Sequence, residues 1–139
     1  MSKLTPVFKD TITVLNRLNG VDNKDKIDIW YKSVVKNCFF SNKEVSSGVK
    51  GLVTAGTRYI CRVPESKSYT PYDKWIKTQK GFTFSLGDYI ILGEVKEADI
   101  NTKNIVQIIN KYKPNSFEIK YFKNNTRVGF LKHYHLEGV

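Results

Sequence analysis

Apolar and polar positions between residues 82 and 139 follow an order that predicts a strand, a helix and a hairpin. Gly87-Asp88 is a turn dipeptide, and the stretch Tyr89–Leu92 after it is apolar at successive positions. A strand with this pattern needs cover on both faces. We therefore expect Tyr89–Leu92 to lie between two packed layers.

A short amphipathic helix is predicted over residues 101–112. Ile105, Ile108, Ile109 and Tyr112 are spaced i, i+3, i+4, i+7, which places them on one helical face. Asn101 or Thr102 can cap its start, and Pro114 ends it because proline lacks the backbone N–H that continues a helix. An expected core follows, with the helix packed on the sheet: Tyr89, Ile91, Ile105, Ile108, Ile109, Ile119 and Tyr121.

The remaining apolar segments predict strands. Residues 117–122 alternate, turn at Asn124-Asn125 and return through 128–131, which indicates a hairpin. Residues 10–18 and 58–63 also indicate strands, the second ending at Pro64. Residues 27–40 form the longest extended segment and are partly apolar on both faces. This segment suits a bent barrel strand, or an arm that leaves its own domain to pair with a neighbour.

Two long connections stand out in so short a chain. Residues 41–57 are rich in Ser, Gly and Lys and predict a mobile loop, and residues 65–81 form a second one. The pattern as a whole predicts a mainly β fold with one short helix. We expect one domain over residues 1–139, a small β-barrel with long loops and a C-terminal helix plus β-hairpin.

Composition limits the class of protein. The 139 residues are 40% hydrophobic and 13% aromatic, which excludes a disordered chain. No apolar run approaches the length of a membrane-spanning helix, and the start shows no apolar signal region, so we expect no membrane partner and no secretion by that route. The formal charge of +10 is compatible with nucleic acid, acidic lipid or an acidic protein surface as partner, or with a generic basic surface.

The residues that carry chemistry in other proteins do not form an enzyme motif here. Cys38 and Cys61 predict buried free thiols. His133 and His135 share one strand face, but the sequence places no further zinc ligand beside them, so ordinary strand histidines are expected. Glu94, Glu97 and Asp99 precede the helix, where negative charge favours its N-terminus. We expect no enzyme, no cofactor and no metal.

The connection 65–81 carries the one binding signal in the residues themselves. Tyr69, Tyr72 and Trp75 alternate with Lys67, Lys74 and Lys77, and Lys80 follows. Aromatic rings stack on bases while lysines neutralise phosphate, which indicates single-stranded nucleic acid. A protein interface is an alternative, and so is a Trp75 that packs back to anchor the loop.

Several segments resemble a family of small uncharacterised proteins of tailed phages and prophages of low-GC Gram-positive bacteria, encoded among head–tail connector genes. These segments are L-G-D-Y-I-I-L-G-E at 86–94, the helix ending near Tyr112, and L-K-H-Y-H-L-E-G at 131–138. Weaker similarity covers 12–16 and 31–40. The resemblance implies a virion protein of the head-completion or stopper type. Such a protein is a small barrel that forms a ring between the portal-bound adaptor and the tail, around genome DNA.

This resemblance sets the expected function. We expect a homo-oligomeric ring, six- or twelve-fold, at the head–tail interface of the virion, assembled in the host cytoplasm. Its neighbours would be adaptor or portal and tail-terminator or tail proteins. The two long connections would make the contacts, with Tyr69, Tyr72 and Trp75 at the interface and Lys74, Lys77 and Lys80 on channel DNA, bound without sequence specificity. The alternative is a nucleic-acid-binding module with an oligonucleotide-binding-type barrel, and a third possibility is a small hydrolase.

Overall fold

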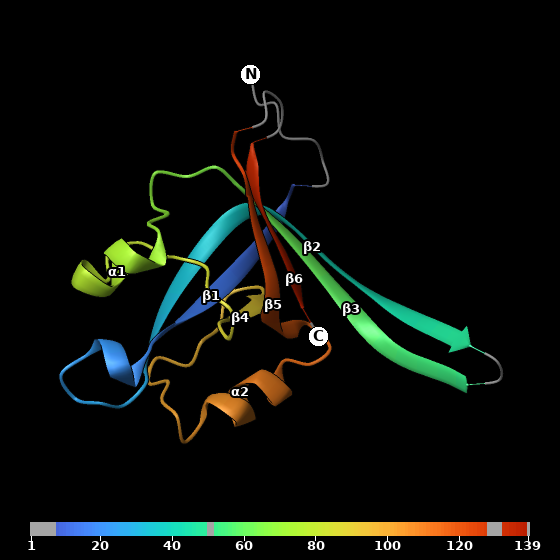
Figure 1. The fold of residues 1–139 in the computed structure, drawn as a ribbon, viewed down its shortest axis with the longest axis horizontal. Coiled ribbons are helices and arrows are strands. Elements are labelled where there is room, and N and C mark those ends of the chain that lie inside the picture. Colours follow the sequence, from blue (N-terminus) through green and yellow to red (C-terminus); the bar gives the residue numbers. More distant parts are fainter. Residues whose placement is uncertain (1–7, 50–51, 128–131, 139) are drawn as a thin grey trace.

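The computed structural model describes residues 8–49, 52–127 and 132–138, with the backbone alone described for 44–49 and 52–56. Its elements in chain order are β1 (Asp10–Leu18), the 3-10 turn η1 (Gly20–Asp22), β2 (Ile29–Val49), β3 (Leu52–Pro64), α1 (Tyr72–Thr78), β4 (Tyr89–Leu92), α2 (Ile105–Lys111), β5 (Ser116–Asn125) and β6 (His133–Gly138). The strands close into an antiparallel barrel in the order β1-β2-β3-β6-β5-β4 (Figure 1). The predicted mainly β fold with a small barrel is confirmed.

β4 lies between two apolar layers, as its sequence predicts. Ile90 points into the barrel, where it packs with Ile12 and Phe117. Ile91 points outward and packs with Leu15 and the apolar face of α2. Because β4 is apolar on both faces, it can separate the barrel interior from the apolar layer under α2.

α2 confirms the predicted helix and its packing. Ile105, Ile108 and Ile109 are buried against β1 and β4. The start differs slightly, because the N-cap residue is Asn104, which makes no side-chain capping bond. Asn101 instead forms the preceding turn, in which its carbonyl accepts the Ile105 N–H at 2.9 Å. The helix ends at Lys111, before Pro114.

Two residues of the expected core are less buried than predicted, although Tyr89 still packs against the cluster under α2. Tyr89 is half-buried, and Tyr121 is 48% exposed. Strict alternation along β5 would place Tyr121 on the same side as Ile119. The pairing with β6 shifts register between these two residues, so a β-bulge turns Tyr121 outward.

β2 changes partner along its length. Residues 29–38 pair with β1, and residues 39–49 pair with β3. The change coincides with a register shift opposite Asp10 and Ile12, and with Asn37 in the left-handed region at φ 62°. An extra residue in one strand bends it. The bent barrel strand predicted for 27–40 is confirmed, and the strand continues beyond it into a projecting ribbon. Pairing of this segment with a neighbour stays a prediction.

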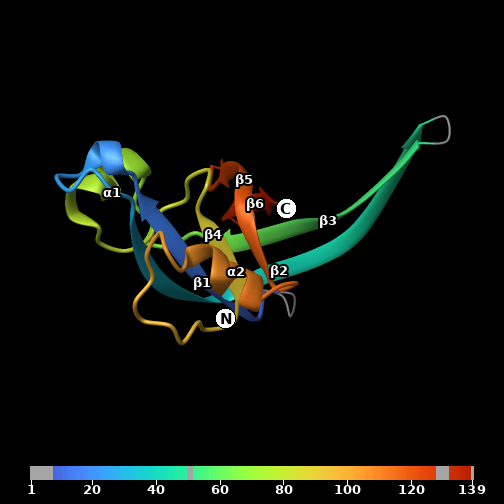
Figure 2. The ribbon, with the colours of Figure 1, turned by 90° about the horizontal axis from the view of Figure 1, so that it is seen from below.

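The loop predicted over 41–57 is wrong. The ladder between β2 and β3 runs from Phe39↔Arg62 to Val49↔Leu52. We call residues 43–58 the arm, and it projects away from the barrel (Figures 1 and 2). Seven residues on each side reach about 23 Å at ~3.3 Å per residue. The Gly and Ser content indicated a loop, but these residues form backbone pairs.

The second predicted connection, 65–81, contains a helix that the sequence reasoning missed. α1 begins after Pro71, whose fixed φ suits a helix start, and Asp73 lies in its first turn. It ends at Gln79, which is left-handed at φ 53° and donates its N–H to the Trp75 carbonyl.

The C-terminal hairpin is confirmed in outline. β5 pairs antiparallel with β6. The predicted turn at Asn124-Asn125 is wrong, because both residues lie in β5 and pair with Tyr134 and His133. The predicted return strand over 128–131 lies outside the described residues. β6 also pairs with β3, which closes this side of the barrel.

Candidate functional site

Trp75 anchors its own segment. Its side chain is fully buried, meets the Tyr31 ring edge-on at 5.4 Å, and donates its Nε1–H to the Gly81 carbonyl at 3.4 Å. A ring buried in this way has no surface for a partner. The structure therefore favours the anchoring alternative over an interface role for Trp75.

The two tyrosines of this segment also make contacts within the chain. Tyr72 Oη accepts from Asn19 Nδ2 at 2.7 Å and donates to Asp22 Oδ2 at 2.8 Å, which ties α1 to η1. The Tyr69 ring lies 4.3 Å from that of Tyr134 and stacks on Phe84 at 5.7 Å. These contacts use both rings to fasten the 65–81 connection to the barrel.

Lys74, Lys77 and Lys80 are all exposed, on α1 and just beyond it. α1 lies on the side of the barrel away from the arm (Figure 1). Exposed lysines of this kind suit any acidic partner or solvent. A DNA contact for these three residues stays a prediction.

Among the described residues, the strands of the arm pair with each other alone. Residues 59–64 of β3 pair with β6 as well as with β2, whereas 52–58 pair with β2 alone among the described residues. At its base, Asn42 donates to the Pro114 carbonyl at 3.0 Å, and Arg58 pairs with Glu137 at 2.9 Å. Beyond that base, the ribbon presents two open edges. Open strand edges are templates for pairing with another chain.

A buried polar cluster joins β1 to the turn before β4. Asn16 Nδ2 donates to Asp88 Oδ2 at 2.9 Å and to the Thr83 carbonyl, and the Arg17 N–H donates to Asp88 Oδ1 at 3.0 Å. Burial raises the pKa of the Asp88 carboxyl to about 7, although the donors from Arg17 and Asn16 lower it. The cluster fixes the Gly87-Asp88 turn that the sequence predicts.

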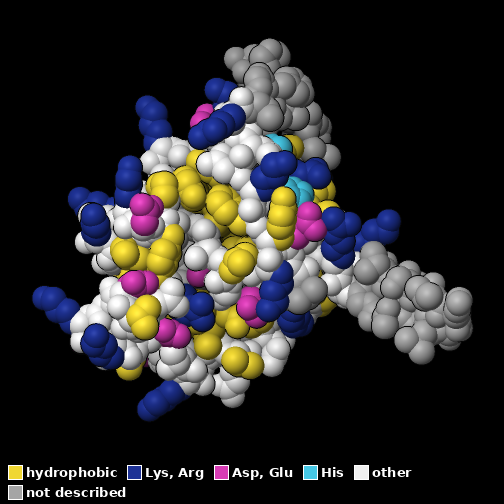
Figure 3. Space-filling view, in the orientation of Figure 1, with side chains coloured by type: hydrophobic (Ala, Val, Ile, Leu, Met, Phe, Trp, Pro, Cys, Tyr) yellow, Lys and Arg dark blue, Asp and Glu magenta, His cyan; other side chains and the backbone are white. Residues whose placement is uncertain are grey.

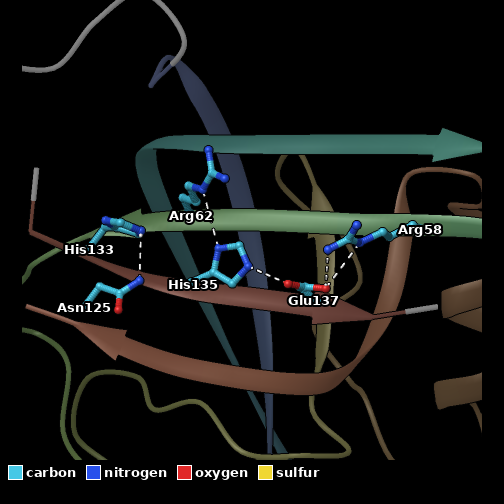
Figure 4. Close-up of polar contacts among 6 residues, drawn as sticks. All are labelled: Arg58, Arg62, Asn125, His133, His135 and Glu137. Carbon is cyan, nitrogen blue, oxygen red and sulfur yellow. Dashed lines mark hydrogen bonds and ion pairs between the residues drawn. The ribbon is translucent and has the colours of Figure 1, made fainter.

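A second polar surface covers the outer side of β3, β6 and β5, and Figure 4 shows its contacts. Arg62 Nε donates to His135 Nδ1 at 3.5 Å, and His135 Nε2 lies 2.8 Å from Glu137 Oε2. Arg58 completes the chain at Glu137. We call this surface the β3–β6–β5 face. In Figure 3 both histidines (cyan) lie among Lys and Arg side chains.

The thiols are buried and free, as predicted. Burial raises the pKa of Cys38 to about 12, so it is protonated and unreactive as a nucleophile at neutral pH. The expectation for the acidic segment before α2 was wrong at Glu97. Its carboxylate meets Lys111 Nζ at 2.9 Å and Tyr112 Oη at 2.7 Å, near the C-terminal end of the helix.

Two features are absent from the described residues. These residues include no group of three or more His, Cys, Asp or Glu side chains that could hold a metal. Within the same residues, no helix has the length and apolar character needed to cross a membrane.

The sequence reasoning missed the β3–β6–β5 face because it treated basic residues as scattered. The signal lies in the alternation along two strands, where outward positions are polar: Tyr121, Lys123 and Asn125 on β5, and His133, His135 and Glu137 on β6. Only the pairing of β3 with β6 adds Arg62 to this set.

A family model described as "Family of unknown function (DUF6751)" matches residues 7–139, so the chain belongs to that family. No curated protein and no solved structure matches the chain.

Proposed function

We propose that this DUF6751 member is a structural virion protein, a head-completion or stopper-type connector whose copies form a ring around the DNA channel. The observation that carries the proposal is the arm, which leaves the barrel with both edges open. An isolated two-stranded ribbon is at best marginally stable in water. The arm therefore gains stability by adding to a surface of a neighbouring copy.

The composition of the arm supports close contact. Lys50 is the single charged residue between positions 45 and 57, in a chain that is 26% charged overall. The segment is also rich in Gly, Ser and Ala, and small residues let another backbone approach closely. Such a segment loses little hydration when an interface covers it.

The geometry suits a ring. An arm that projects from one side of a subunit and docks on a different surface of the next makes a heterologous contact. Heterologous contacts generate closed rings when the rotation between copies closes. This proposal includes the expected six- or twelve-fold order, the adaptor, portal and tail neighbours, and assembly in the host cytoplasm. The similarity of sequence segments to connector-region proteins supports it.

Electron microscopy tests the proposal directly. The purified chain, alone or with its neighbouring connector proteins, should give closed rings in class averages. An antibody against the chain should label the head–tail junction of phage particles, with an antibody against the major capsid protein as the control that labels the shell. A chain that forms no ring under either condition and is absent from particles would contradict the proposal.

A further inference from the structure

The β3–β6–β5 face places cationic side chains in one row across the barrel wall. Residues of β6 alternate, so that His135 points outward while Tyr134 and Leu136 are buried. The registers set Lys123 of β5 on one side of His135 and Arg62 of β3 on the other. Arg62 and Lys123 therefore lie two strand spacings of about 4.8 Å apart. Between them, both ring nitrogens of His135 are engaged by Arg62 and Glu137.

Local contacts hold Arg62 in place. Its guanidinium carbon lies 5.5 Å from the centre of the Phe39 ring, and its Nε donates to His135 Nδ1. Among the described residues, neither Arg62 nor Lys123 has a carboxylate within ion-pair distance. The bidentate end of Arg62 and the Lys123 ammonium are therefore available to an external anion.

The acidic residue of the face is already engaged. Glu137 Oε1 pairs with Arg58 at 2.9 Å, and Oε2 with His135 at 2.8 Å. The hydrogen bond from His135 and the charge of Arg58 hold the pKa of Glu137 below its usual value. Glu137 thus orients His135, and the positive charge of the paired Arg58 offsets the negative charge of Glu137.

A hollow and an exposed aromatic ring complete the face. The hollow has a volume of about 440 Å³, within the usual range of ligand pockets. Its lining includes Arg62, Tyr121, Lys123, His135 and Glu137. Tyr121 is 48% exposed because of the β5 bulge, so its ring is available for stacking.

We propose that the β3–β6–β5 face binds single-stranded nucleic acid. Arg62 and Lys123 contact the phosphodiester backbone, and Tyr121 stacks on a base. Both interactions are those by which single strands are held on barrel surfaces. An acidic peptide would use the same cations but gain nothing from stacking, and a duplex keeps its bases stacked internally. The site meets the arm only at Arg58, at the arm's base, and does not depend on the connector proposal.

Fluorescence anisotropy with a labelled oligo-dT strand and a labelled duplex of equal length tests the site at two salt concentrations. The wild-type chain should bind the single strand more tightly and lose affinity as salt rises. Arg62→Gln with Lys123→Gln should reduce the slope of log K against log salt by about 1.4, since each contact contributes ~0.7. Tyr121→Ala should weaken single-strand binding about 5-fold or more.

The matched control is Lys24→Gln with Lys103→Gln, which removes the same charge from exposed positions outside the β3–β6–β5 face. It should leave the salt slope within error of the wild-type value once circular dichroism shows all variants folded. The proposal is overturned by equal losses in both double variants, by duplex binding as tight as single-strand binding, or by no binding at low salt. Binding to polyglutamate in place of the oligonucleotide would also overturn it, and would assign the face to an acidic protein.

Discussion

The two halves of the β2–β3 hairpin differ in what surrounds them. Near the barrel, Tyr59, Cys61 and Val63 are buried, and their strand pairs on both sides. In the arm, the same two strands pair with each other alone among the described residues. The β2–β3 ladder is thus continuous, but at one end it forms part of the closed barrel and at the other it forms the arm. The comparison indicates that the barrel carries the folding stability, and the proposal assigns assembly to the arm.

Removing an aromatic side chain from the centre of the barrel core should have the largest effect on stability, and it tests this comparison. Phe117 is fully buried and stacks on Tyr59 at 5.2 Å. Phe117→Ala should lower the free energy of unfolding by about 3–5 kcal/mol. Urea unfolding should give the same loss in the full chain and in a chain without the arm, since distant sites add. A loss that depends on the arm would break the division between the two regions.

The layer under α2 should behave as a second part of the same core. Ile108 is 5% exposed against β1 and β4, so Ile108→Ala should cost about 2–5 kcal/mol. Val106 lies on the same helix but is 61% exposed, and Val106→Ala should change stability by less than about 0.5 kcal/mol. Similar losses in both variants would show that α2 does not pack as described.

Asp88 gives the stability of the barrel a pH dependence. Its pKa is about 7 in the folded chain and about 3.9 in a model peptide, so folding takes up a proton between these values. The unfolding free energy should therefore fall as pH rises from about 4 to 7, and level off above. Asp88→Asn removes this contribution, so urea unfolding at pH 5 and pH 8 should show a smaller decrease than in the wild type. An unchanged decrease would contradict the assignment.

The α1 lysines should have the smallest effect on stability. Lys74, Lys77 and Lys80 are exposed, so changing all three to Gln should alter the melting temperature little and leave assembly intact. If they hold channel DNA, tail-less heads that carry the triple variant should leak packaged DNA. If the triple variant retains packaged DNA as well as the wild type does, these lysines do not hold DNA and are an ordinary solvated surface.

Local pattern predicted the elements whose burial follows simple periodicity. β4 was expected at its observed bounds, and α2 at its packed face, because apolar spacing determines both. Periodicity could not show the β5 bulge that turns Tyr121 outward, because a bulge depends on the pairing with β6. The same limit hid the arm, whose Gly and Ser residues indicate a loop until their cross-strand partners are known.

Candidate site residues were harder to predict for the same reason. Tyr69, Tyr72 and Trp75 form a pattern that suits either an interface or an anchor, and only the fold shows them packed inside the chain. Arg62 and Lys123 are far apart in sequence and flank His135 only through the barrel closure. Sequence reasoning names such residues when they share a strand, and misses them when the sheet brings them together.

The most direct test of the assembly role removes the arm without opening the barrel. Lys43 and Arg58 face each other in the ladder, so Asn-Gly can replace residues 44–57 as a two-residue hairpin turn. Light scattering after size exclusion should show the wild type as a multiple of its 16.0 kDa chain and the shortened variant as a folded monomer. A shortened variant that assembles like the wild type, or a wild type that stays monomeric at every concentration, would contradict the account.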